Sequence, residues 1–268
     1  MEKLMTQKRQ YRRRNNTIKK STKTKLVTII IVIVLVLIQR WLAYNNSTTM
    51  AELPEYSGKA FVTIDHNIPS FTDEDYEKAE KSYIDLSELD TLGRCGPAEM
   101  SVTKKDLPTE KRGDISKVRP TGWRQAFYPD LISRNGGALY NRCHLLMYAL
   151  SGLNDDERNL ITGTVYLNIE GMLSNESEIL DYVSADNRIL YRVTPVFNGT
   201  ELVARGVHIE VGDVETKGSK FHKNIYCYNV QPGVNISYKT GNSSVGENPD
   251  TQDNIELIQE LINYFTQN

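Results

Sequence analysis

The chain has 268 residues, of which 39% are hydrophobic and 25% are charged, so it can bury a core and is not a disordered chain. The net charge of −2 conceals an asymmetry, because residues 1–40 hold eleven of the 32 basic residues and one of the 34 acidic residues. The remaining chain therefore carries a net charge of −12, which excludes the broadly basic surface typical of nucleic-acid-binding proteins.

The first predicted element is a membrane segment that follows a basic leader, residues 1–25. The apolar run "LVTIIIVIVLVLI" extends through Tyr44 to give nineteen residues at 26–44. As a helix this segment would span roughly 28 Å at about 1.5 Å per residue. Arg40, Trp41 and Tyr44 are residue types found at membrane interfaces. The cations before the segment predict a cytoplasmic N-terminus.

The role of this segment has alternatives. The long leader and the lack of a clear A-x-A site favour an uncleaved, single-pass anchor over a cleaved signal peptide. A buried core helix is disfavoured by the unbroken β-branched residues after a basic leader. The anchor interpretation gives a polar stalk at residues 45–58 and an extracellular domain at residues 59–268. A cleaved segment would give a secreted protein instead.

Three cysteines, Cys95, Cys143 and Cys227, lie in the exported part, where disulfides are allowed. At most one pair can form, and no spacing matches a zinc site. The plain alternative is that all three are small core residues.

The first half of the exported part predicts short strands with one helix start. The Ser70–Tyr83 segment begins with a Ser/Thr cap and acidic residues, which is typical of a helix N-terminus. Strands are predicted at Ala60–Ile64, at the end of residues 88–102, around Trp123–Tyr128 and at Ala138–His144, with a loop or short strand at Asn159–Gly163.

The second half predicts a long helix and three longer strands. Apolar residues at Val165, Ile169, Met172, Leu173, Leu180 and Val183 recur at helical spacing within Thr164–Ser184. Alternation predicts strands at residues 187–197, 202–214 and 223–233, then a polar, loose segment at 240–253 and a short helix at 254–265. The predicted class is α+β, with an antiparallel sheet and a central helix.

The stretch "YNRCHL" holds the first candidate site residues. Successive side chains of a strand point to opposite faces, so Arg142 and His144 share a face that Cys143 does not. A Cys143–His144 nucleophile is therefore disfavoured. A guanidinium beside an imidazole suits phosphate binding next to a base active near neutral pH.

The predicted helix carries the second group. Glu176 projects about 20° from Val165, inside the apolar face, where a carboxylate is costly unless it is paired or near a metal. Asn168 lies about 80° from Glu176 by the same count. The plain alternatives are that the helix has turned Glu176 to solvent and that Asn168 is a surface residue.

The segments "YNRCHL", "ERNLITGTVYLNIEGM", "YRVTPVF" and "NVQPG" resemble the DNA/RNA non-specific endonucleases with a ββα-metal (His-Me finger) site. The likeness is greatest to the membrane-anchored or secreted nucleases of Gram-positive bacteria, and it runs from about Leu86 to Thr240. Many members begin with Asp-Arg-Gly-His, where this chain has Asn141-Arg142-Cys143-His144. The role of position 141 is therefore open.

The resemblance implies a ββα-metal nuclease core that cleaves DNA and also RNA. It implies that His144 is the general base and that Asn168 is the one protein ligand of a Mg²⁺ ion, for which Mn²⁺ can substitute. Glu176 would orient water on the metal, Asn159 would fix the site, and Arg142 would steady the scissile phosphate. Mg²⁺ keeps several waters and needs few protein ligands, which agrees with this set.

Other residues have weaker claims. We interpret His66, His208 and His222 as structural or surface residues and Trp123 as a core residue. Arg192 suits either substrate contact or a carboxylate partner. A locally basic run precedes the Arg142 strand and suits either a phosphate-binding groove or a solvated loop: Lys104, Lys105, Lys111, Arg112, Lys117, Arg119 and Arg124.

Two functions compete. The first is a metal-dependent nuclease on the outer face of the membrane. The second is a non-catalytic surface module that binds nucleic acid or a protein, which the departures at Asn141 and Cys143 keep open. A third, a cysteine hydrolase at Cys143, is disfavoured by the strand alternation.

Overall fold

A computed structural model describes residues 53–246 together with Val34. The predicted leader, the rest of the predicted anchor, the stalk up to residue 52 and the helix predicted at 254–265 lie outside the described residues. Among the residues that the structure does describe, no helix has the length and apolar character needed to cross a membrane.

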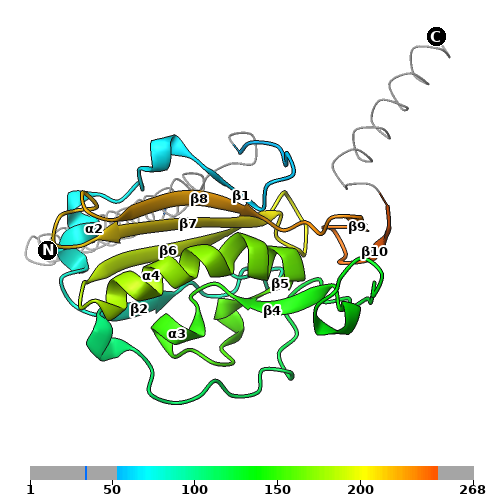
Figure 1. Cartoon of the computed structure of the whole chain (residues 1–268), viewed down its shortest axis with the longest axis horizontal. Coiled ribbons are helices and arrows are strands. Elements are labelled where there is room, and N and C mark those ends of the chain that lie inside the picture. Colours follow the sequence, from blue (N-terminus) through cyan, green and yellow to red (C-terminus); the bar gives the residue numbers. More distant parts are fainter. Residues whose placement is uncertain (1–33, 35–52, 247–268) are drawn as a thin grey trace, which may run out of the picture. The chain divides into compact units, whose positions relative to one another are not determined.

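The centre of the fold is a six-stranded antiparallel sheet in the order β1-β8-β7-β6-β3-β2 (Figure 1). Each neighbouring pair is antiparallel, which confirms the predicted α+β class with an antiparallel sheet. The strands are β1 (Phe61–Thr63), β2 (Tyr83–Leu86), β3 (Ala98–Val102), β6 (Ile189–Val196), β7 (Gly206–Asp213) and β8 (His222–Tyr228).

A strand–strand–helix unit packs on one face of this sheet. Strand β4 (Tyr140–His144) pairs antiparallel with β5 (Leu160–Thr164). The chain then enters a π-helical segment, η6 (Leu167–Leu173), which continues into α4 (Ser174–Ser184). Figure 1 shows α4 lying across the sheet, with β4 and β5 next to it.

The shorter elements connect these layers. Helix α2 (Asp73–Lys78) begins with a capping box on Thr72, as the acidic first turn predicts. Helix α3 (Tyr148–Ser151) follows β4, and β9 (Val234–Ile236) pairs with β10 (Ser243–Val245). The 3-10 turns are η2 (Asp65–Asn67), η3 (Lys104–Asp106), η4 (Asn135–Gly137) and η5 (Glu157–Asn159).

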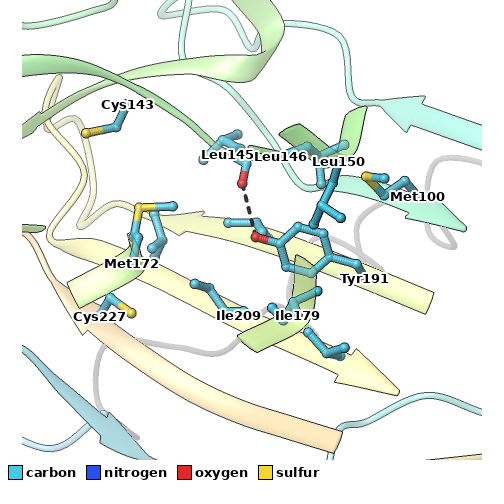
Figure 2. Close-up of a cluster of buried hydrophobic side chains, with 14 of the residues drawn as sticks. Met100, Cys143, Leu145, Leu146, Leu150, Met172, Ile179, Tyr191, Ile209 and Cys227 are labelled. Carbon is cyan, nitrogen blue, oxygen red and sulfur yellow. Dashed lines mark hydrogen bonds between the residues drawn. The ribbon is translucent and has the colours of Figure 1, made fainter. Parts of the chain in front are cut away.

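The main core fills the space between the sheet and α4. Alternate residues of β6 and β7, such as Tyr191 and Ile209, pack with Met172 and Ile179 from the helix. Figure 2 shows the Tyr191 hydroxyl donating to the Leu145 carbonyl oxygen at 3.5 Å. Burying side chains of this size stabilises the fold by about 1.5–3 kcal/mol each. The core therefore fixes α4 and the end of β4 relative to the sheet.

The π-helical segment corrects the predicted apolar face of this helix. Leu173, predicted to be buried, is 45% exposed, whereas Leu167 and Ile179 are buried. An i→i+5 turn takes up about one residue more than an α-turn, so it rotates the following residues by roughly 100° from the α-helical count. A strict 3.6-residue period could not anticipate that rotation.

Two other predictions need correction. Residues 123–128 do not form a strand; only Phe127 makes an isolated bridge, to Ala138. The segment predicted to be loose at 240–253 contains β10 in its described part. At the start of the described chain, residues 53–58 lie against β8, with Tyr56 packed edge-on against Tyr228.

All three cysteines are buried and unpaired, which confirms their interpretation as core residues. Cys143 has no exposed surface and faces Gly163 across the hairpin. A Cβ atom at Gly163 would lie 2.3 Å from the Cys143 sulfur. The missing side chain at Gly163 thus makes room for cysteine at position 143.

Candidate active site

A pocket of about 770 Å³ opens beside the strand–strand–helix unit. Four of the five predicted site residues line it, and they come from two elements: Arg142 and His144 from β4, and Asn168 and Glu176 from the helix. The π-helical segment helps to bring both helix side chains to the pocket. Because its wider turn takes up about one extra residue, the angle about the helix axis between Asn168 and Glu176 is smaller than the value of about 80° expected for an α-helix.

His144 is held by its main-chain surroundings. It is 8% exposed, and its Nε2 lies 2.8 Å from the carbonyl oxygen of Asn154. A carbonyl oxygen only accepts, so Nε2 carries the hydrogen and Nδ1 of the neutral ring keeps its lone pair. Burial lowers the pKa of His144 below its usual 6.5. The ring is therefore neutral at pH 7 and able to accept a proton.

Glu176 is a buried carboxylate without a partner. It is 6% exposed, and no hydrogen bond or ion pair to it occurs among the described residues. Burial raises its pKa to about 8. Its charge acts on the uncharged groups Cys143, Tyr191 and Cys227, which cannot compensate it. Such a site favours either a proton or a cation.

Asn168 is the second helix residue that presents an oxygen atom to the pocket as a possible metal ligand. Its amide is partly exposed in the pocket and makes no side-chain hydrogen bond within residues 53–246. No three His, Cys, Asp or Glu side chains of the described part gather as metal ligands. The donors present are oxygen atoms, which suit a hard cation that keeps its waters.

Asn159, the fifth predicted residue, lies outside the pocket and acts on its frame. It is fully buried, its Oδ1 accepts from the Leu146 N–H at 2.8 Å, and its Nδ2 donates to the Leu146 carbonyl at 3.0 Å. Its own carbonyl accepts from the Leu145 N–H at 2.9 Å. These three bonds fix the turn directly after His144.

Replacing Asn159 by alanine should therefore unfold the protein more easily. The Leu146 N–H would lose its partner in the core, and the Leu146 carbonyl would keep only the Ser151 hydroxyl at 3.3 Å, at a cost of about 1–3 kcal/mol. Urea unfolding measures the change, with Asn198→Ala, at an exposed turn position, as the matched control. Equal stability of the two variants would contradict the role given to Asn159.

Arg142 is held by two main-chain carbonyl groups. Its Nε donates to Val118 at 2.6 Å and its Nη2 donates to Ser116 at 2.7 Å. Its guanidinium carbon lies 4.2 Å from the centre of the Trp123 ring. Trp123 packs against a second core cluster, as predicted, and also lines the pocket.

Cys143 takes no part in the pocket, as the strand alternation predicts. Burial raises the pKa of its thiol well above the usual value, which makes it inert. We expect Cys143→Ser to keep near-normal activity while losing about 1–3 kcal/mol of unfolding free energy, because no partner awaits the buried hydroxyl. Activity assays below the unfolding temperature check this. Loss of activity from a folded variant would restore the cysteine-hydrolase interpretation.

The other weak candidates lie away from the pocket. His208 is buried with Nε2 2.6 Å from Asn224 Oδ1, and His222 bonds the Gly218 carbonyl. Arg192 pairs with Glu99 at 2.9 Å and with Glu210 at 3.4 Å. Its role is therefore an ion pair within the sheet, and not a contact in this pocket.

One residue of the site, Asn154, could not be predicted from the sequence. Asn154 holds His144 through its main-chain carbonyl, and its Oδ1 accepts from the Gly113 N–H at 2.9 Å. Asn154 lies in a loop ten residues from His144. Every residue type has a main-chain carbonyl, so the residue type does not reveal this contact.

Comparison with known proteins assigns this chain to one family. The family model described as "DNA/RNA non-specific endonuclease" matches residues 74–215, just over half of the chain. The chain belongs to the DNA/RNA non-specific endonuclease family. The match confirms the family resemblance and makes the protein an endonuclease by class.

Solved structures of nucleases share the fold. NucA from Streptococcus agalactiae with magnesium bound is 23% identical, with a TM-score of 0.63 over 76% of this chain and 95% of that one. The same protein without metal is 22% identical, with a TM-score of 0.61 over 76% of this chain and 96% of that one. The Sda1 nuclease with zinc bound is 24% identical, with a TM-score of 0.55 over 70% of this chain and 97% of that one. A comparison with curated sequences found no similar protein.

Proposed function

We propose that the protein is a metal-dependent, sugar-non-specific endonuclease that hydrolyses phosphodiester bonds of DNA, and of RNA, at the His144 pocket. The observation that carries the proposal is that one pocket is lined by His144, a neutral imidazole whose Nε2 is held by a carbonyl, and by Glu176, a buried carboxylate with no bonded partner among the described residues. A base and a cation-seeking group in one pocket are the two requirements of metal-assisted hydrolysis.

In the proposed reaction, His144 Nδ1 takes a proton from the water whose oxygen attacks phosphorus. The new P–O bond forms as the ester P–O bond to the leaving oxygen breaks. The Asn154 carbonyl, bonded to Nε2, fixes the tautomer and stabilises the imidazolium that results. Asn159 keeps the ring in place by holding the turn after β4.

Asn168 and Glu176 would hold the divalent cation, Asn168 as a direct ligand and Glu176 through water. The cation offsets the negative charge that builds up on the phosphate during hydrolysis. We propose Mg²⁺ as the physiological ion, with Mn²⁺ as a substitute; one related structure carries magnesium and another carries zinc. Filling the site would also lower the pKa of Glu176 from about 8.

We further propose that the nuclease domain works outside the cell, either anchored by residues 26–44 or secreted after cleavage. The apolar segment and its basic leader support export. The alternative function is a non-catalytic module that binds nucleic acid or a protein on the same fold. The departures Asn141 and Cys143 favour that alternative, although Cys143 fits its site through Gly163.

The proposal is tested with circular single-stranded DNA, supercoiled plasmid and RNA, each incubated with the purified protein in Mg²⁺, Mn²⁺, Zn²⁺ or EDTA. Circular substrates report internal cleavage only. We expect all three nucleic acids to be cut with Mg²⁺ and none in EDTA. Binding without cleavage in every metal would favour the non-catalytic module.

A further inference from the structure

The segment Glu110–Arg119, which we call the basic loop, forms one wall of the pocket through Arg112 and Ile115. It holds four basic and two acidic residues, a net charge of +2 in a chain that carries −12 after residue 40. Lys111, Arg112 and Lys117 are exposed and make no ion pair among the described residues. This charge is therefore available to an outside anion.

The basic loop has no regular secondary structure. Its own Arg119 donates to the carbonyls of Ser116 and Val118, and side chains from other elements bind the loop to the rest of the fold. Arg142 donates to the carbonyls of Ser116 and Val118. The Asn154 amide accepts from Gly113, and the Tyr148 hydroxyl donates to the Glu110 carbonyl at 3.0 Å. These anchors come from β4, α3 and the loop after α3, next to His144.

The guanidinium of Arg142 is well suited to anchoring. Its planar group lies over the Trp123 ring while its fork donates to two carbonyl groups. A lysine would keep the charge but could form neither the fork nor the planar stack. Two of the donors that a phosphate contact would use are thereby directed to the basic loop.

Like charges gather around this pocket. Arg119 acts against the charge of Arg142, whose pKa lies below its usual value through burial and this repulsion. Arg112 also lowers the pKa of His144, after the larger effect of burial. Glu176 is the one acidic side chain among the lining residues. Such an arrangement favours an anionic ligand.

We propose that Arg142 acts on the substrate as a positioning residue, by holding the basic loop where Arg112 and Lys117 bind backbone phosphates on either side of the cleaved bond. The proposal rests on the proposed nuclease function and names the element that binds its substrate. It differs from direct contact of Arg142 with the scissile phosphate.

The test is a double-mutant cycle in the full-length protein, with kcat and KM measured separately at several salt concentrations. Arg142→Lys and Arg142→Ala should raise KM by a similar factor, about tenfold or more, and change kcat less than threefold. Arg112→Gln with Lys117→Gln should raise KM and make the slope of log affinity against log salt shallower by about 1.8, roughly 0.9 per cation. When the two loop changes are combined with Arg142→Lys, KM should rise little beyond its value in Arg142→Lys alone.

Lys104→Gln with Lys105→Gln is the matched control, since both lysines are exposed and lie outside the pocket. It should change KM less than twofold. Near-normal KM in Arg142→Lys, or additive effects of Arg142→Ala and the loop changes, would overturn the proposal. If the Arg142 variants fail to fold, the salt slope of the loop variant is compared with that of the control variant. Equal slopes would overturn the proposal.

Affinity for a labelled oligonucleotide in EDTA separates this inference from the function it rests on. A wild-type protein that cuts nothing but shows the same non-additive binding would disprove the nuclease while keeping the basic loop. Normal cleavage with no effect of the loop changes would disprove the basic loop alone.

Discussion

Replacing Glu176 by glutamine should make the protein more stable and less active. In the absence of divalent metal, burial raises the folded pKa of Glu176 from 4.5 to about 8. A raised folded pKa means that the folded state holds the proton more tightly than the unfolded state does. The wild type therefore loses stability as the pH rises from about 4.5 to about 8, and the uncharged variant does not.

The expected size follows from the pKa difference. At about 1.36 kcal/mol per pH unit, the variant should gain roughly 3 kcal/mol over the wild type between pH 5 and pH 8. Urea unfolding in EDTA at both pH values measures it. The same substitution should lower kcat/KM or metal affinity by about 10–100-fold, the usual cost of losing a residue that orients a metal's surroundings. A stability difference independent of pH would contradict the account.

Replacing His144 by alanine should lower kcat by about 10²–10⁴-fold, the range typical of a lost general base. No other residue of the proposed site can take the proton in place of Nδ1. Glu176 and Asn168 hold the metal in the proposed reaction, and Arg142 carries no basic atom. Added imidazole should restore part of the activity by filling the space left by the ring. His144→Gln is the matched polar variant, and it should be equally inactive.

The stability of the His144 variants separates chemistry from folding. Both lose the bond from Nε2 to the Asn154 carbonyl, which at about 0.5–1.5 kcal/mol is too small to unfold a domain of this size. Circular dichroism and unfolding midpoints check that the fold persists. Activity within tenfold of the wild type in a folded His144→Ala variant would exclude His144 as the base.

Much of the fold could be predicted from the sequence, because period-2 alternation in β6, β7 and β8 reflects a sheet buried on its helix-facing side. Glu176 is buried, as its predicted place inside the apolar face requires, although the π-helical segment changes the angle used in that prediction. The strand predicted at residues 123–128 failed for a different reason. The Gln125 side chain bonds the main-chain N–H and C=O of Tyr140, where a strand would use its own main chain.

The details of the pocket depend on features that a linear pattern does not contain. The π-helical segment changes which residues of the helix share a face, so Leu173, which the α-helical period predicts in the core, is exposed. The contacts of His144 with Asn154, and of Arg142 with Ser116 and Val118, are made to main-chain carbonyls, which every residue type carries. Residue identity alone could not reveal them.

The most direct test of the central claim is the conversion of supercoiled plasmid by the purified wild type in Mg²⁺ and in EDTA, beside His144→Ala in Mg²⁺. The account predicts that the wild type in Mg²⁺ nicks and then degrades the plasmid, while the other two samples leave it supercoiled. Intact plasmid in all three samples of folded protein would contradict it, and would leave a nucleic-acid- or protein-binding module as the function of this pocket.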